Sequence, residues 1–423
     1  MRYSRLRGMQ DIVPPEVDRW RAVESAFQET FDRFGYQGIR TPIMEPTDLF
    51  VRAVGEQSDI VSKEMYTFED RGRRSVTLRP ENTASVIRAY LENGMHRLGG
   101  IQRLCYLGPM FRYDRPQAGR YRQFHQAGAE AIGGDNPALD VEMIEVVVEA
   151  MKRIGFAELD IRINSVGGSE SRASYRGVLL EAIRAHADTL GAETIERYAK
   201  NPLRVFDSKD CGDQFKQSLP VISDYLVEAD AAHFARVTEL LAGRGISFTV
   251  DPYMVRGIDY YTRTVFEVFH EEHGAQSALC GGGRYDGLVE QCGGPSTPAI
   301  GFSAGLERIV AALPGGTDRA KESHGHIVYY VVCAETDASA RALRAAAELR
   351  RLGNTELDLS DRSRKKQLQA AEKKHARFAV VVESSLANRL TVRDISARRD
   401  DEIAEESLAE YFQDRIDDEK ESC

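Results

Sequence analysis

The sequence has few cysteines and no long apolar run, and both absences narrow the class of protein. Its six cysteines, at positions 105, 211, 280, 292, 333 and 423, include no C-x-x-C pair. Free thiols in a reducing compartment are therefore a better expectation than a disulfide or zinc framework. No run approaches the roughly 18 apolar residues that a membrane span needs, and the N-terminal segment MRYSRLRGMQDIVPP lacks the apolar core of a signal peptide. We expect a cytoplasmic globular protein with no membrane partner.

Over the whole chain the basic residues are outnumbered, with 56 Lys and Arg against 66 Asp and Glu. The net charge of -10 argues against a protein that coats nucleic acid indiscriminately. It is compatible with a local basic site, because charges act over only about 8–10 Å at ordinary salt concentrations. The length of 423 residues, 42% of them hydrophobic, suits two or three globular domains.

The familiar glycine-rich nucleotide-binding loops are missing as well. The segment CGGGRYDGL, residues 280–288, has neither the G-x-G-x-x-G spacing nor that of a P-loop. Three successive glycines are most often used in turns. The segment therefore predicts neither a Rossmann nor a Walker-type site.

The stretch from Tyr106 to Gly134 predicts two strands joined by a charged loop. The first strand runs from Tyr106 to Asp114 and the second starts at Arg120; Pro and Gly break the chain between them. Because side chains alternate across a strand, one face of the second strand gathers Arg120, Arg122, Phe124, Gln126, Gly128 and Glu130. The opposite face holds three alanines, which suits close packing: Ala127, Ala129 and Ala131.

This polar face has two interpretations. A solvated sheet face would show a similar pattern. Arginines beside an aromatic ring and an acid, however, suit a nucleotide together with a cationic small molecule. Arg112 and Asp114 share a face of the first strand and would extend the polar surface. Gly128, in the middle of the second strand, predicts that some group approaches the backbone from the polar side.

Periodicity elsewhere predicts further helices and strands. The expected helices are residues 15–35, 84–93 and 136–155, and the expected strands are residues 38–43 and 159–164. Pro42 favours a sheet edge for the strand that contains it. Residues 167–245 are rich in Ala, Glu and Arg with helical spacing, which predicts an inserted helical domain. Strand character returns at residues 247–269, and residues 299–308 run from a strand into a helix.

The C-terminal part has its own pattern. Strands alternate with helices over residues 326–394, which predicts a small α/β domain with a mixed sheet. Residues 362–377 hold seven Lys or Arg against one acid, and residues 400–421 hold eleven acids against two bases. A solvated helix face and a solubilising tail are the plain interpretations; a phosphate-facing surface is the alternative for the basic helix.

Several blocks of the chain resemble one known family. FRYDR at 111–115, followed by GRYRQF at 119–124, looks like motif 2 of the class II aminoacyl-tRNA synthetases, and GRYRQFHQ looks specific to the histidyl-tRNA synthetases. RGIDYYTRTVFE and GGGRYDGLVE resemble the two signature peptides of that family, and GFSAGLER resembles class II motif 3. The blocks follow the order of the family and cover most of residues 1–310.

The resemblance implies an α+β fold in which an antiparallel-sheet catalytic domain carries a helical insertion and is followed by an α/β anticodon-binding domain with a mixed sheet. The implied segments are the catalytic residues 1–166 and 247–312, the insertion 167–246, the linker 313–325 and the anticodon-binding domain 326–423. The helix at 15–35 and the proline-containing strand after it are similar to class II motif 1, which implies a homodimer.

The implied activity is ATP-dependent ligation of L-histidine to tRNA(His) through a histidyl-adenylate, with release of AMP and pyrophosphate. Mg2+ would accompany ATP, and no side chains that ligate a metal are expected. Attack of a carboxylate on the α-phosphate brings two anions together, so the site must supply fixed positive charge. Arg112 and Arg256 are the implied catalytic residues.

The resemblance also implies the binding residues. The ATP set is Arg112, Asp114, Arg120, Phe124 and Arg308. The histidine set is Glu81, Asn82, Thr83, Arg112, Gln126, Glu130, Arg256, Tyr260, Tyr261 and Tyr285. The tRNA set is Arg115, Gln117, Lys365 and Lys366.

Some roles have alternatives. Glu81 would also suit the start of a helix, where an acid complements the dipole, and Arg308 could face either solvent or a phosphate. Asp114 and Asn82 stand where the family more often has Glu and Gly. One alternative function is a non-catalytic, histidine-sensing regulatory subunit of ATP phosphoribosyltransferase. Another class II synthetase, such as the prolyl or threonyl enzyme, is disfavoured by RGIDYYTRTVFE.

Overall fold

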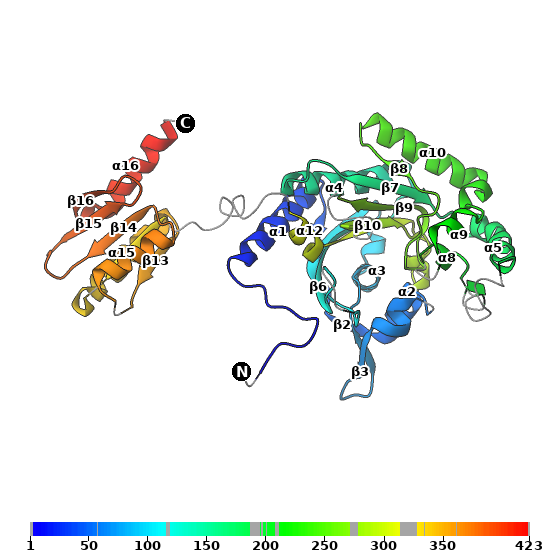
Figure 1. Ribbon diagram of the computed structural model, residues 1–423, viewed down its shortest axis with the longest axis horizontal. Helices are drawn as coiled ribbons and strands as arrows, with labels where there is room; N and C mark the ends of the chain where they lie inside the picture. The colour runs from blue at the N-terminus through cyan, green and yellow to red at the C-terminus, as the bar shows by residue number, and fades with distance from the viewer. Residues whose placement is uncertain are drawn as a thin grey trace. The chain divides into compact units, whose positions relative to one another are not determined.

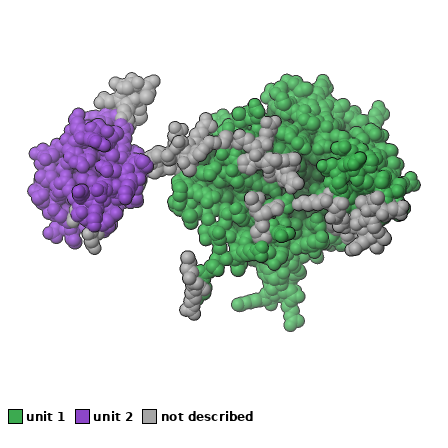
Figure 2. Space-filling view, viewed as in Figure 1, with its two compact units in different colours: residues 1–316 green, residues 317–423 purple. Residues whose placement is uncertain are grey.

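The chain forms two compact units. The computed structural model describes residues 3–421 apart from residues 57, 116–118, 187–194, 196–197, 200, 208–210, 271–277, 314–327, 334 and 361. The units are Met1–Gly316 and Thr317–Cys423 (Figure 2). The expected linker therefore lies almost entirely outside the described residues. No helix in the described part of the chain is long and apolar enough to cross a membrane.

An eight-stranded sheet organises the first unit (Figure 1). In spatial order its strands are β1 (Gln37–Gly38), β5 (Gln102–Phe111), β6 (Gln123–Ile132), β11 (Ala299–Gly305), β10 (Cys280–Arg284), β9 (Thr262–Phe269), β7 (Asp160–Ser165) and β8 (Thr249–Val250). The inner pairs are antiparallel, and the outermost pairs, β1 with β5 and β7 with β8, are parallel. A small second sheet holds β2 (Met44–Pro46), β4 (Ser75–Leu78) and β3 (Tyr66–Glu69).

Two apolar clusters lie against the large sheet. One cluster combines sheet residues with the helices α1 (Glu16–Arg33), α4 (Pro137–Ile154), α10 (Glu228–Gly243) and α12 (Leu306–Ala312). The other combines the sheet with α2 (Thr47–Val54), α3 (Thr83–Glu92) and α11 (Leu288–Gln291). Short π- and 3-10 turns are η1 (Ile60–Glu64) and η2 (Met95–Arg97). Gln126 and Glu130 of β6 share their face with Phe124 and Ile132, which belong to the second cluster.

The limits of α4 follow the sequence signals. The Asn136 side chain accepts a hydrogen bond from the Ala138 N–H, Pro137 takes the first helical position, and Gly155 ends the helix with φ of 113°. The predicted apolar stripe is buried in the main core, including Val147 and Met151. Each such side chain contributes about 1.5–3 kcal/mol on burial.

Two predicted strands are wrong in part. Of residues 38–43 only Gly38 lies in a strand, β1. The residues that follow leave the sheet before β2 begins, and among them Pro42 has no N–H group to donate to a neighbouring strand. Residues 247–269 do not form one strand. Residues 251–261, which include Pro252 and Gly257, form a loop between β8 and β9.

The helical segment after β7 has a small core of its own. Its described helices are α5 (Ser169–Arg184), α8 (Arg204–Asp207), α9 (Asp213–Gln217) and the 3-10 turn η3 (Ile222–Tyr225). They bury a cluster that includes Tyr175, Leu179 and Val205. In contrast, Val237 and Leu241 of α10 belong to the main core. The expected boundaries of the insertion stay a prediction.

The second unit is built on a five-stranded mixed sheet, as predicted. Its spatial order is β13 (Thr355–Asp358), β12 (Tyr329–Cys333), β14 (Phe378–Val382), β15 (Arg389–Asp394) and β16 (Arg399–Ala404). The first three strands are parallel and the last two pairings are antiparallel. One apolar cluster joins α14 (Ser339–Leu352) and α16 (Leu408–Glu421) to the sheet, and another joins α15 (Arg364–Lys373). The turns η5 (Thr336–Ala338) and η6 (Glu405–Ser407) complete the unit.

The sequence did not indicate β16, which lies at the start of the acidic segment. The strand is rich in charge and sits at the sheet edge, where charged side chains protect against unwanted strand pairing. Arg393 of β15 donates to Asp400 across the ladder, with Nε–Oδ1 and Nη2–Oδ2 distances of 2.6 Å each. Cross-strand ion pairs therefore replace the apolar alternation on which a sequence-based prediction depends.

Candidate active site

A cavity of about 380 Å³ in the first unit collects most of the predicted site residues. Its lining includes Glu81, Thr83, Arg112, Asp114, Arg120, Phe124, Gln126, Arg256, Tyr260, Tyr261 and Arg308. They come from the α3 start, the β5–β6 hairpin, the loop before β9 and the β11–α12 junction. Segments far apart in the sequence thus meet at one place.

The hairpin presents its two faces as the alternation predicted. Phe124 and Gln126 line the cavity, whereas the three alanines of β6 are fully buried in the main core. The predicted start at Arg120 is early, because β6 begins at Gln123. Before the strand, the Arg122 guanidinium lies 3.6 Å from the centre of the Tyr113 ring.

Glu130 lies behind the cavity wall and is fully buried. Its Oε1 accepts hydrogen bonds from the Thr83 hydroxyl at 2.8 Å and from the Tyr106 hydroxyl at 3.4 Å. Its Oε2 accepts one from Tyr285. Burial raises the pKa of Glu130 to about 8, although the three hydroxyls act in the opposite direction. In the empty site the neutral form of this carboxyl group is therefore favoured near neutral pH.

Two glycines make room for this arrangement. A Cβ on Gly128 would lie 2.4 Å from the Tyr106 hydroxyl, so the group that approaches this backbone is the neighbouring tyrosine. A Cβ on Gly301 would lie 1.6 Å from Glu130 Oε2. Larger residues at either position would displace the carboxylate or its hydroxyl partner.

The start of α3 holds Glu81 and Asn82 in different ways. The Glu81 carboxylate accepts from the N–H groups of Thr83 and Ala84, at 2.7 and 3.0 Å, which is the helix-start role noted for it. It also lines the cavity, and burial raises its pKa despite these bonds. Asn82 instead accepts from Thr41 Oγ1 at 2.7 Å, and it is not among the cavity-lining residues of the described chain.

Guanidinium groups also line the cavity, together with carboxylates that include Glu64 and Glu267. Arg112 donates to the Pro80 carbonyl at 2.8 Å, and Arg308 donates to the Ala278 carbonyl at 2.7 Å. Arg120 pairs with Asp114 at 3.3 Å. Burial lowers the pKa of Arg308, and the positive charges of Arg120 and Arg112 lower it further. Mutual repulsion of this kind would be relieved by a bound polyanion.

Arg256 occupies the loop before β9 and is held by an acid. Its Nη1 donates to Glu267 of β9. Burial alone would lower the pKa of Arg256, but Glu267 and then Tyr261 reverse this effect, so that the pKa is raised. Its Nε–H is buried and has no hydrogen-bond partner among the described residues. One donor of the side chain thus stays available.

A buried ion network supports the strand that leads into Tyr285. Arg284 is fully buried and donates to Asp140 of α4 at 2.6 Å and to the Gly134 carbonyl at 2.7 Å. Asp140 also pairs with His233 of α10 at 2.7 Å. Breaking such a pair on one side costs about 3–5 kcal/mol, so Arg284 fixes β10 against the helices behind it.

Comparison with known families identifies the kind of protein to which this site belongs. The histidyl-tRNA synthetase model matches residues 8–309, and an anticodon-binding-domain model matches residues 328–415. The chain belongs to the histidyl-tRNA synthetase family. The predicted family and its class II α+β fold are thereby confirmed.

Individual relatives cover nearly all of the chain. The histidine–tRNA ligase of Thermosynechococcus vestitus is 45% identical over 389 residues, which is 92% of this chain and 90% of that protein. The ligase of Desulforamulus reducens is 44% identical over 417 residues, or 97% and 99%. The crystal structure of apo histidyl-tRNA synthetase from S. aureus aligns with a TM-score of 0.81 at 34% identity, covering 97% of this chain and 99% of that one.

Some lining residues of this family member were not identified from the sequence. Tyr106 lies six positions before Arg112, and period two places both on one face of the strand predicted from Tyr106 to Asp114. Glu267 closes the signature peptide that begins at Arg256. Both line the cavity. The alternation could have indicated Tyr106, whereas the ion pair of Glu267 depends on the loop folding back over β9.

None of the residues predicted to contact tRNA is among the described residues that line the cavity. Arg115 is exposed, and its backbone N–H donates to Asp114 Oδ1 at 2.6 Å. Gln117 lies outside the described residues. Lys365 and Lys366 are exposed on α15 in the second unit, next to the buried Gln367. They leave a basic surface open on this helix.

Proposed function

We propose that the chain ligates L-histidine to tRNA(His) with ATP, through a histidyl-adenylate, and releases AMP and pyrophosphate. One observation carries the proposal beyond family membership. A buried carboxylate, Glu130, surrounded by three hydroxyl donors lies at one end of a cavity whose other end gathers arginines. The first end suits an imidazole and the second suits the phosphates of ATP.

Histidine binds at the Glu130 end. An imidazole offers a donor and an acceptor, or two donors when protonated, and Glu130 and the Tyr261 hydroxyl serve the two ring nitrogens. The aromatic rings of Tyr260 and Tyr285, 5.5 Å apart, complete the pocket. The ammonium group is bound by Glu81, Thr83 and Gln126. Asn82 acts by fixing the start of α3.

ATP and the histidine carboxylate meet at the arginines. Arg112 and Arg256 neutralise the carboxylate and the α-phosphate, and Arg120 and Arg308 bind the β- and γ-phosphates. Phe124, whose ring centre lies 5.2 Å from the Arg112 guanidinium, stacks on adenine, and Asp114 contacts the nucleotide. The rate gain comes from positioning and from fixed positive charge.

Mg2+ enters with ATP. Among the described residues no group of three or more His, Cys, Asp or Glu side chains is arranged to hold a metal. Mg2+ commonly keeps several waters and binds through substrate phosphates with one or two carboxylates. Asp114 and Glu267 are lining carboxylates within the same cavity. The ion supplies charge neutralisation on the phosphates when bound.

The chain acts as a homodimer, with motif 1 at the interface. Ile43 and Met44, which follow helix α1 and strand β1, are 43% and 53% exposed. Exposed large apolar side chains at this position support an interface there. The tRNA contacts are Arg115, Gln117, Lys365 and Lys366.

The first half-reaction is tested by exchange of labelled pyrophosphate into ATP with each of the twenty amino acids and no tRNA. Exchange with histidine alone is expected. Absence of exchange in a protein that still binds histidine by calorimetry would contradict the proposal and favour the regulatory alternative.

The tRNA contacts are tested with the double variant Lys365→Ala/Lys366→Ala. Pyrophosphate exchange should be unchanged, and KM for tRNA(His) in the charging assay should rise about 3- to 10-fold, because phosphate contacts are lost. Lys152→Ala/Lys216→Ala, on other helices, is the charge-matched control. Equal effects in both double variants would remove Lys365 and Lys366 from the tRNA surface.

A further inference from the structure

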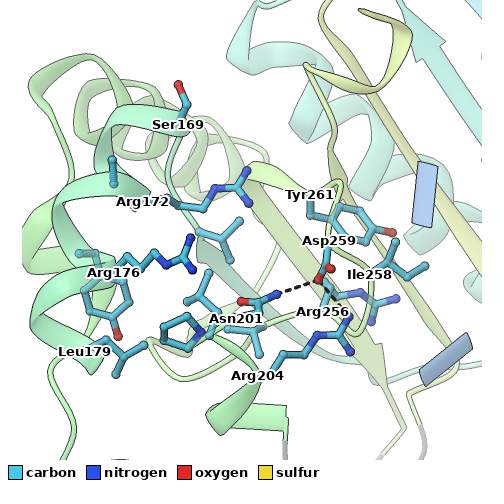
Figure 3. A pocket seen from close by; sticks show the side chains of 16 residues that line it. Ser169, Arg172, Arg176, Leu179, Asn201, Arg204, Arg256, Ile258, Asp259 and Tyr261 are labelled. Carbon is cyan, nitrogen blue, oxygen red and sulfur yellow. Dashed lines mark hydrogen bonds and ion pairs between the residues drawn. The ribbon is translucent and has the colours of Figure 1, made fainter. Parts of the chain in front are cut away.

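A second cavity, of about 450 Å³, lies between the helical segment and the loop before β9 (Figure 3). Its volume is in the range of ligand sites in proteins. Arg172 and Arg176 reach into it from α5, while Arg204 and Asp259 approach from the other side. The proposed function assigns no role to this cavity.

The charges around this second cavity are unbalanced. Four arginines line it, namely Arg172, Arg176, Arg204 and Arg256, and Asp259 is the only carboxylate in the described lining. Asp259 Oδ1 is already engaged, because it accepts from Asn201 Nδ2 and Arg204 Nη2 at 2.9 Å each. Arg256 is paired in turn with Glu267 of β9, and the described lining still holds more guanidinium groups than carboxylates.

Several arginine donors at the cavity lack partners. Nε of Arg204 and Nε of Arg256 are buried without a hydrogen bond among the described residues. The Arg172 guanidinium also forms no hydrogen bond or ion pair within the described chain. Burial lowers its pKa, with Asp259 and Asp230 only partly opposing this effect. Arg172 is half-buried, and a bound anion would give its guanidinium the partner that the described chain does not supply.

The rest of the lining is apolar. Leu179 of α5 and Val255 and Ile258 of the loop contribute to it. A ligand that matches both parts of the cavity carries an anionic head for the arginines and an apolar body for these side chains.

We propose that this cavity binds a small phosphate monoester with an apolar or aromatic body. A monoester is dianionic near neutral pH, and guanidinium groups bind its oxygens through paired, charge-assisted hydrogen bonds. The excess of positive charge favours a dianion over a singly charged phosphodiester or carboxylate. The inference goes beyond the ligation of histidine and does not depend on it.

Occupancy of the second cavity couples to the active-site cavity. Arg204, Arg256, Ile258 and Tyr261 line both, so a ligand that moves the loop changes the position of side chains proposed to bind histidine. By linkage, histidine and the phosphate monoester alter each other's affinity by the same factor. The cavity is thus a site from which a metabolite can regulate histidine binding.

The test is calorimetric titration with phenyl phosphate. The active-site cavity is first filled with ATP and histidinol, which lacks the carboxylate that would react. Wild-type protein should bind phenyl phosphate, and Arg172→Gln should bind it about 10-fold more weakly or worse, as expected for the loss of a charge-assisted hydrogen bond. Arg184→Gln is the matched control, because Arg184 lies on the same helix, is exposed and does not line the cavity.

Several results would overturn the proposal. They are no binding to wild type, equal binding by Arg172→Gln and Arg184→Gln, or equally tight binding of diphenyl phosphate, a monoanion. The last result would point to a phosphodiester, such as an RNA end, as the true occupant.

Thermal unfolding gives an independent readout. If Arg172 serves a ligand, Arg172→Gln should have a Tm close to that of wild type, because the substitution removes no hydrogen bond or ion pair within the described chain. A fall of several degrees would make Arg172 structural and contradict the proposal. Pyrophosphate exchange by wild type, measured in parallel, tests the proposed function separately.

Discussion

The two ends of the active-site cavity are built on opposite principles. At the histidine end, Glu130 is fully buried and its oxygens accept from three hydroxyl groups before any substrate arrives. At the phosphate end, Arg112 and Arg308 donate to backbone carbonyls, and their charges are only partly balanced. The hydrogen bonds of the histidine end are thus formed before substrate binds, whereas the guanidinium groups of the phosphate end can still bind an anion.

This difference assigns the choice of amino acid to the histidine end and the phosphoryl-transfer reaction to the phosphate end. A buried, satisfied polar pocket rejects ligands that leave its groups unpaired, so the histidine end decides which amino acid enters. An excess of fixed positive charge stabilises negative charge that develops during phosphoryl transfer, so the phosphate end drives the reaction. The four predictions below test this division, from the largest expected effect to the smallest.

Arg256→Ala should remove the feature that joins the two ends. The side chain lines the cavity beside both Tyr261 and Glu267, and its loss leaves the Glu267 carboxylate unpaired. We expect pyrophosphate exchange to fall by about 10³-fold or more, as for other groups that stabilise a transition state. Circular dichroism should show a folded protein. Arg236→Ala, on the exposed side of α10, is the control, and near-normal exchange in Arg256→Ala would exclude the proposed role.

Glu130→Gln should damage the histidine end alone. The amide keeps the shape of the carboxyl group but cannot take up the negative charge that would pair with the imidazole when histidine binds. We expect kcat/KM for histidine to fall by about 10²-fold, consistent with one or two charge-assisted hydrogen bonds, while KM for ATP changes little. Glu290→Gln, exposed on α11, should behave as wild type. A larger change for ATP than for histidine would contradict the division between the ends.

Arg308→Gln should damage the phosphate end alone. The guanidinium groups of Arg308, Arg120 and Arg112 repel one another, and a bound polyanion relieves this repulsion. We expect KM for ATP to rise about 10-fold with little change in KM for histidine. Steady-state exchange kinetics at varied ATP and histidine give both values. If KM for histidine rose as much, the two ends would not be independent.

The pH dependence of stability should also report on Glu130. Its pKa is raised from 4.5 to about 8 by burial, so between these values the folded chain holds a proton that the unfolded chain releases. The stabilising contribution is complete below pH 4.5 and is lost as pH rises through 8. In this window the free energy of unfolding should fall less steeply with pH in Glu130→Gln than in wild type. The two slopes should differ by up to roughly 1 kcal/mol per pH unit. Denaturant titrations between pH 5 and 8 without histidine provide the measurement, and parallel curves for the two proteins would refute it.

Strong local signals in the sequence led to correct local structure. The alternation along β6 correctly separated Gln126 from the alanines behind it, and the helix expected over residues 136–155 agrees with α4 to within one residue at each end. Where tertiary contacts replace local signals, the prediction was wrong or incomplete. Strand β16 is stabilised by partners on β15, and residues 251–261 leave the sheet to form a loop although they are rich in strand-forming residues.

The sequence by itself determined the family, the two-unit α+β organisation and eleven of the side chains that line the active-site cavity, because motifs and periodicity are properties of neighbouring residues. Only the tertiary structure showed that Glu267 holds Arg256 and that Gly301 makes room for Glu130. It alone revealed the second cavity, where Arg172 of α5 meets the loop that ends at Tyr261. Such contacts join residues distant along the chain, so their distances, burial and charge balance exist only once the chain has folded.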